Sequence, residues 1–265
     1  MAHLGPSRTD ADRLNAKHLP LASAFLIAYR KRMKHPTLQF NLSPELDQKM
    51  AWEFFQQSMH GGDLFWETRA VLYHEELKHL GQQKQPKKFL NHYVHNTYSE
   101  NIESLQARLD EIEELWTEQQ STFFSETDKR FPTHPWPHAH VTAYGSLFDF
   151  CPRFLQEGSF QIFLGDTDEG VLFTIAHELL HIIFYDFVNT HRPTFKTLET
   201  ESGVFWELAE LFNIVIQDTP AFINLHGSPG PTSYTDLAPY VEHAKQIWKK
   251  DVLSWLDEMI VILSK

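Results

Sequence analysis

The residues best able to do chemistry in this chain form the segment His177-Glu178-Leu179-Leu180-His181. On a helix, side chains four residues apart lie on one face, so both histidines can bind a single metal ion. Glu178 lies one step around the helix, where it can reach a water molecule held by that ion. Zinc with two histidine ligands and one carboxylate keeps a fourth position open and lowers the pKa of water bound there to about 7. Glu178 would take a proton as the hydroxide attacks a carbonyl, and return it to the leaving amine.

The surroundings of this segment favour a metal site over a chance pattern. From Val171 to Val188 nearly every position outside the motif is apolar, which predicts a helix buried on most sides. A buried carboxylate without a partner costs roughly several kcal/mol. The alternative is a core helix whose histidines bond to backbone carbonyls and whose glutamate has a basic partner. We expect the metal site, with one zinc ion per chain.

A third protein ligand is expected on the next apolar helix, predicted from Thr200 to Gln217. Two acids three residues apart, Glu207 and Glu210, lie among apolar residues there. Glu207 is favoured as the ligand because aliphatic side chains share its face. Glu210 is the alternative ligand, or else the group that orients a histidine N–H.

These residues resemble the gluzincins, the thermolysin-like zinc metallopeptidases in which an HExxH helix is followed by a helix bearing a glutamate ligand. The resemblance covers about Ser159 to Gln217. It implies that His177, His181 and Glu207 are the ligands and that Glu178 is the general base. It also implies a peptide or protein substrate, hydrolysed at a peptide bond by a metal-activated water.

The resemblance extends to the strand before the HExxH helix. In such enzymes an edge strand binds an extended peptide through main-chain hydrogen bonds. The residues that would form this substrate-binding strand are Phe160, Gln161, Ile162 and Phe163. Gluzincins also steady the oxyanion with a tyrosine or a histidine, and the candidates are His226 and Tyr144.

The elements before the site are predicted to be helices. Ser43-Pro44 is a typical helix start, and Asp63 can cap a second helix. Apolar residues recur at spacings of three and four from Ser99 to about Phe124, which predicts a helix with one buried stripe.

The pattern changes after residue 131, where three prolines interrupt any helix. Residues 138–150 and 159–164 favour strands, and helices are expected over 168–188, 200–217 and about 235–263. The predicted fold is α+β and mostly helical. A small antiparallel sheet, the HExxH helix and the glutamate-bearing helix follow an N-terminal helical region.

Two regions are expected along the chain, packed as one unit. Residues 1–130 form the helical N-terminal region, and residues 131–265 form the metallopeptidase-like region with the sheet, the two site helices and a closing helix. A chain of 265 residues is long enough for this arrangement.

Composition narrows the possible partners and the compartment. The formal net charge is −12, and an acidic field repels phosphate backbones and anionic lipid, so neither nucleic acid nor a membrane is an expected partner. Cys151 is the single cysteine, and the polar start and the lack of an apolar run near 20 residues do not indicate a signal peptide or a membrane span. A cytoplasmic location is expected, while the oligomeric state is left open.

Overall fold

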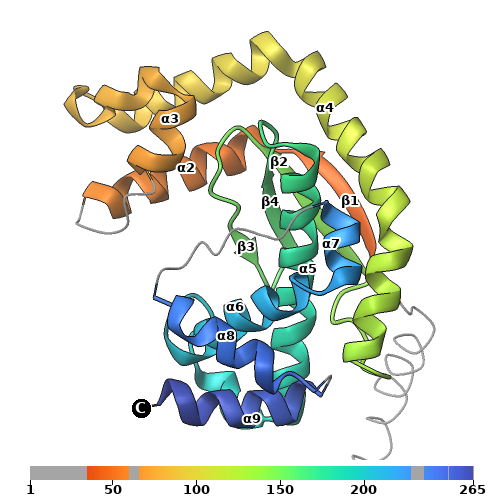
Figure 1. Cartoon of the computed structure of the whole chain (residues 1–265). Helices are drawn as coiled ribbons and strands as arrows, with labels where there is room; N and C mark the ends of the chain where they lie inside the picture. Colours follow the sequence, from red (N-terminus) through yellow and green to blue (C-terminus); the bar gives the residue numbers. More distant parts are fainter. Residues whose placement is uncertain (1–34, 60–65, 228–235, 250, 265) are drawn as a thin grey trace, which may run out of the picture.

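The computed structural model describes residues 35–59, 66–227, 236–249 and 251–264. The elements in chain order are β1 (Thr37–Leu42), α2 (Pro44–Met59), η2 (Trp66–Ala70), α3 (Val71–Tyr73), η3 (Glu75–Gln82), α4 (Pro86–Arg130), β2 (His140–Ser146), β3 (Arg153–Phe154), β4 (Ser159–Phe163), α5 (Asp168–His191), η4 (Pro193–Thr197), α6 (Gly203–Gln217), α7 (Pro220–His226), α8 (Ala238–Ile247) and α9 (Val252–Leu263). The described chain is mostly helical around one small sheet, which confirms the predicted α+β class (Figure 1).

The sheet is mixed, with four strands in the order β1-β2-β4-β3. β1 pairs with β2 and β2 pairs with β4 in parallel, while β3 runs antiparallel to β4. The prediction of an antiparallel sheet is therefore wrong. The prediction failed because β1 lies in the region expected to be helical and was not recognised as a strand. The long helical connection between β1 and β2 allows the two strands to run in parallel.

The first described helix starts where the sequence predicted. The Leu46 N–H donates to the Ser43 hydroxyl at 3.2 Å, so Ser43 caps α2. The second predicted cap, Asp63, lies outside the described residues.

The helix α4 is longer than predicted. It begins at Pro86 rather than Ser99 and continues for 45 residues, and in Figure 1 it curves around the outside of the sheet. Its first turns bury Leu90, Val94 and Tyr98, which are spaced four residues apart. These residues form a buried stripe that the sequence analysis overlooked among polar and aromatic neighbours.

The helix α5 carries the HExxH segment and lies beside the sheet (Figure 1). Its start is fixed by Thr167, whose hydroxyl accepts a hydrogen bond from the Gly170 N–H at 3.1 Å. By length and composition α5 could cross a membrane, contrary to the expectation that no apolar run reaches that length. However, 78% of its most apolar window is buried inside the protein, as in the core helix of a globular fold.

The chain after α5 packs helices against one another. α6 contacts α5, α8 and α9, and Figure 1 shows this group around the lower half of α5. The closing helix predicted over 235–263 is two helices, α8 and α9, because the chain leaves the helical conformation at Trp248, which has φ −65° and ψ 109°. Asp251 then caps α9 by accepting from the Leu253 N–H at 3.2 Å.

Strand pairing and both hydrophobic cores join residues from the two sides of the expected boundary at residue 130. β1, from the N-terminal region, pairs along its whole length with β2. One hydrophobic core joins the second half of α4 to the helices α5 to α9, and a smaller core joins α2, η3 and the start of α4 to residues 147–150. In the described chain, both cores therefore contain side chains from both regions.

A buried carboxylate ties the smaller core to the sheet. Asp47 of α2 is fully buried and accepts hydrogen bonds from Ser146, Gln161 and Tyr98 at 2.6, 2.6 and 2.9 Å, and from the Leu147 N–H at 2.8 Å. Four donors satisfy the carboxylate, which links α2, α4, β2 and β4.

Candidate metal centre

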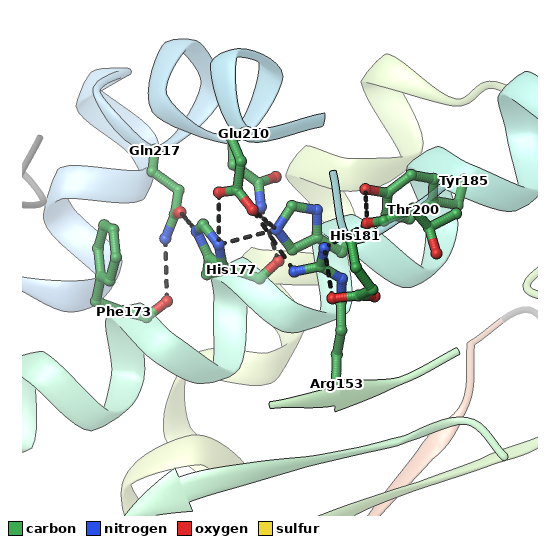
Figure 2. A network of polar contacts seen from close by, with 10 residues as sticks. Arg153, Phe173, His177, His181, Tyr185, Thr200, Glu210 and Gln217 are labelled. Carbon is green, nitrogen blue, oxygen red and sulfur yellow. Dashed lines mark hydrogen bonds and ion pairs between the residues drawn. The ribbon is translucent and has the colours of Figure 1, made fainter. Parts of the chain in front are cut away.

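Two helices bring His177, His181 and Glu210 together. Figure 2 shows the two imidazoles of α5 and the carboxylate of α6 pointing toward one another. His177 Nε2 lies 3.3 Å from Glu210 Oε2, and His181 Nε2 lies 3.2 Å from Glu210 Oε1. The two Nε2 atoms are 2.9 Å apart. His181 and Glu210 are fully buried, and the His177 side chain is 17% exposed.

The acid in this group is Glu210, the alternative ligand, and the preferred Glu207 is not part of it. Glu207 is half-buried and has no described polar contact with either histidine. The choice failed because apolar side chains surround most of α6, so apolar neighbours did not distinguish its faces. A polar stripe could have identified the face of α6 that meets α5. Asn213 and Gln217 follow Glu210 at spacings of three and seven, and both are buried against α5.

These two amides fix the orientation of His177. The Gln217 amide nitrogen donates to the Phe173 carbonyl at 3.0 Å, which turns its oxygen toward His177 Nδ1, also at 3.0 Å. Nδ1 therefore carries a proton and donates it to Gln217, leaving Nε2 for the Glu210 side (Figure 2). Asn213 donates to the His177 carbonyl at 3.0 Å and holds α6 against this turn of α5.

The geometry fits a divalent cation. Around a tetrahedral zinc with bonds of about 2.0 to 2.1 Å, ligand atoms are roughly 3.3 Å apart. The observed separations are 2.9 Å between the two Nε2 atoms and 3.2 and 3.3 Å from each to the nearer oxygen of Glu210. Neither carboxylate oxygen of Glu210 accepts a hydrogen bond from any described residue. The ligand set of two imidazoles and one carboxylate is common for zinc. The described residues can therefore hold a metal ion at His177, His181 and Glu210.

The protonation preferences of these groups suit metal binding. Burial, and then Arg153, lower the pKa of His181 to about 3, so its imidazole is neutral at neutral pH. Burial alone would raise the pKa of Glu210, but His181 and His177 lower it well below its usual range. Burial also acts against the charged form of His177, yet the Glu210 and Glu178 carboxylates raise its pKa. A cation at this position would compete with a proton for His177 Nε2, because an imidazole binds a metal ion in its neutral form.

Glu178 is buried beside this group. It is 5% exposed, and its Oε2 atom has no hydrogen-bond partner among the described residues. Burial raises its pKa to about 7, with smaller contributions from the carboxylates of Glu210 and Glu201, while His177 and Arg153 act in the opposite direction. A carboxyl group with a pKa near 7 can both accept and return a proton at neutral pH.

A buried arginine, which the sequence analysis did not identify, adjoins the site. Arg153 extends from β3 toward Glu210 (Figure 2), and its side chain is 8% exposed. Its Nη1 atom lies 3.5 Å from Glu210 Oε1, and its Nη2 atom donates to the Thr200 carbonyl at 2.8 Å and lies 3.6 Å from a Glu201 oxygen. A charged residue after Pro152 in a two-residue strand gave no sequence signal for this role.

The two oxyanion candidates lie in different places. His226, at the end of α7, is buried, and its ring packs 5.2 Å from that of Phe173, which lies 5.8 Å from the His177 ring. Tyr144 lies on β2 within the sheet, and no described polar contact joins it to the three ligands. The geometry brings His226, but not Tyr144, to the neighbourhood of His177.

The strand expected to bind substrate is not an edge strand. β4 lies between β2 and β3, and its residues Phe160, Gln161, Ile162 and Phe163 are all buried. Gln161 donates both to Asp47, through its side chain, and to the Pro152 carbonyl, through its backbone N–H. The prediction of a substrate-binding edge at β4 is therefore wrong. The described sheet ends on this side at β3, which is too short to give a strand signal in the sequence.

Comparisons with known proteins leave the site to be interpreted from its own residues. No protein-family model, no curated protein and no solved structure matches this chain. The resemblance to gluzincins therefore rests on the HExxH segment of α5 and on the glutamate of α6.

Proposed function

We propose that this protein is a zinc-dependent hydrolase that cleaves peptide bonds, with His177, His181 and Glu210 as the ligands of one zinc ion. The observation that carries the proposal is the convergence of these three side chains in a buried position, next to a buried glutamate, Glu178, that is not one of the ligands. A bound zinc ion supplies an activated water molecule and polarises the carbonyl to be attacked.

Glu178 is the general base in this proposal. Its carboxylate takes a proton during attack on the carbonyl carbon and returns it to the leaving nitrogen, so the residue ends each cycle unchanged. The buried position of Glu178 keeps its pKa close to the operating pH, where proton acceptance and proton return are both efficient.

Two alternatives use the same residues. The first is a zinc hydrolase acting on a non-peptide amide or ester, because the metal chemistry is the same for these carbonyls. The second is a non-catalytic module stabilised by metal. Glu178 favours catalysis over the second alternative, because a structural metal site has no need for a buried carboxylate that is not a ligand.

Metal content tests the site directly. We expect about one zinc per chain by mass spectrometry of the native protein, and a sharp loss in His177→Ala and Glu210→Ala variants. Glu207→Ala is the matched control, since it removes an acid of the same helix that has no described contact with the histidines, and it should retain zinc. No zinc in the native protein after reconstitution, or equal loss in the control, contradicts the proposal.

A further inference from the structure

Besides Glu178, the guanidinium of Arg153 lies beside the proposed ligands. Its contacts reach three parts of the fold. It starts on β3, lies 5.6 Å above the ring of Tyr185 on α5, and approaches Glu210 on α6. The Tyr185 hydroxyl and Arg153 both donate to the same carbonyl, that of Thr200, at 2.9 and 2.8 Å. Arg153 and Tyr185 therefore fix the turn before α6 as well as the ligand on α6.

The contact with Glu210 is made at one specific oxygen. Arg153 Nη1 lies 3.5 Å from Oε1, which also lies 3.2 Å from His181 Nε2, whereas Oε2 faces His177 at 3.3 Å. Because a carboxylate is planar, a contact at Oε1 also limits the directions in which Oε2 can point. The planar fork of a guanidinium can hold a carboxylate oxygen and a backbone carbonyl at the same time, which a lysine ammonium on a flexible stem does less well.

Charge balance gives a reason for a cation at this depth. The guanidinium lies 3.6 Å from a Glu201 oxygen and 3.5 Å from a Glu210 oxygen, and these two carboxylates and that of Glu178 stabilise its charged form against the cost of burial. A buried guanidinium without such partners would be strongly unfavourable, so its position is tied to this group of acids.

We propose that Arg153 is a positioning residue for the metal site, which holds Glu210 through Oε1 and so keeps its carboxylate facing His177 and His181. This inference rests on the proposed function, since it assumes that Glu210 is a ligand. Arg153 acts through Glu210 and through the turn at Thr200, and it does not itself bind the metal.

The direction in which zinc affinity changes when Arg153 is replaced distinguishes a positioning role from a purely electrostatic one. Removing a positive charge near a dication favours metal binding by electrostatics alone. Removing a group that orients a ligand weakens metal binding, and loss of outer partners of this kind typically costs roughly 10- to 100-fold in affinity. Arg153→Met is therefore expected to weaken zinc binding, against the electrostatic trend.

The experiment measures zinc affinity by competition with a chelator in the full-length native protein, in Arg153→Met and in Arg153→Lys. We expect the zinc dissociation constant to rise roughly 10- to 100-fold in the Met variant. The Lys variant keeps the charge and guards against misfolding of the Met variant, and we expect it to bind zinc more weakly than the native protein. The visible spectrum of the cobalt-substituted proteins should differ from native in both variants, because it reports the coordination of the metal.

Arg130→Met is the matched control. The Arg130 side chain is 10% exposed, lies 5.2 Å from the Phe222 ring and pairs with Glu126 at 3.1 Å, so it resembles Arg153 in burial and partners but pairs with an acid that is not in the metal site. This control should keep native zinc affinity and a native cobalt spectrum. Unchanged or tighter zinc binding in both Arg153 variants, with native cobalt spectra, overturns the inference, as does equal weakening in the control. Absence of zinc binding in the native protein would instead overturn the proposed function.

Discussion

Glu178 has an environment that differs from that of Glu210, although both acids are buried. Glu210 lies against two imidazoles and keeps its charge, whereas Glu178 has one oxygen without a described hydrogen-bond partner and a pKa raised to about 7 by burial. The surroundings thus suit the two carboxylates to different roles. Glu210 is suited to be an ionised ligand, and Glu178 is suited to carry a proton.

Glu178→Gln separates the catalytic role from metal binding. Glutamine keeps the size of the side chain but cannot accept a proton, so we expect turnover on a peptide library to fall by roughly 100- to 10,000-fold. Zinc content should stay native because Glu178 is not one of the three ligands. Native turnover in this variant would exclude Glu178 as the general base, and Glu207→Gln is the control for a glutamate change near the site.

At the scale of elements, the site depends on how α5 and α6 meet. The histidine spacing sets one face of α5, but the third ligand is set by the face of α6 that packs against it. Gln217 and Asn213 hold these two helices in register through the ring and the carbonyl of His177. The chemistry of the site is therefore a property of a helix pair, held in turn by the sheet and by α4.

The buried Asp47 network gives a test of how α2 and α4 are attached to the sheet. Burial raises the pKa of Asp47 from its usual 3.8 to about 6, although four hydrogen bonds act to lower it. Because the pKa is higher in the folded than in the unfolded chain, the stability that Asp47 contributes is fully present below the unfolded value and is lost as pH rises through about 6.

The expected measurement is a difference between two proteins. An asparagine side chain mimics the protonated acid at every pH, so the free energy of unfolding of the native protein relative to Asp47→Asn should fall by roughly 1 kcal/mol between about pH 5 and pH 7.5. Urea unfolding at both pH values measures this difference, and titration of groups common to both proteins cancels. A difference that does not change with pH, or that rises with it, would show that the pKa of Asp47 is not raised in the folded protein.

At the scale of the whole molecule, the proposed zinc ion would link the two helices at the centre of the larger core. An unfolded chain does not hold three ligands in place, so zinc at 100 times its dissociation constant stabilises the fold by about 2.7 kcal/mol. For a chain of this size that corresponds to a rise in Tm of roughly 5 to 10 °C.

Calorimetry with and without zinc, followed by addition of a chelator, measures this shift. The His177→Ala variant should lose most of this rise in Tm, because the substitution removes one of the three proposed ligands. An equal shift in the variant would place zinc binding elsewhere in the chain.

The cytoplasmic location and the absence of nucleic-acid and membrane partners stay predictions from composition.

Short stretches of sequence are enough to predict the local features of this protein. The spacing of His177 and His181, the apolar residues around them and the cap at Ser43 are read over a few residues, and the helices that they predict are present. The helix α5 and its pair of converging imidazoles follow from the 3.6-residue period alone.

Other features are set by packing between distant segments and could not be predicted from the sequence. Four features depend on residues that are far apart in the chain: the choice of Glu210 over Glu207, the parallel pairing of β1, β2 and β4, the covered position of β4, and the presence of Arg153 beside the site. On α6 the two acids differ by three residues, about 60° of helix rotation, and both have apolar neighbours. The packing of α6 on α5 selects one of them, because only the face that meets the histidines can complete the site.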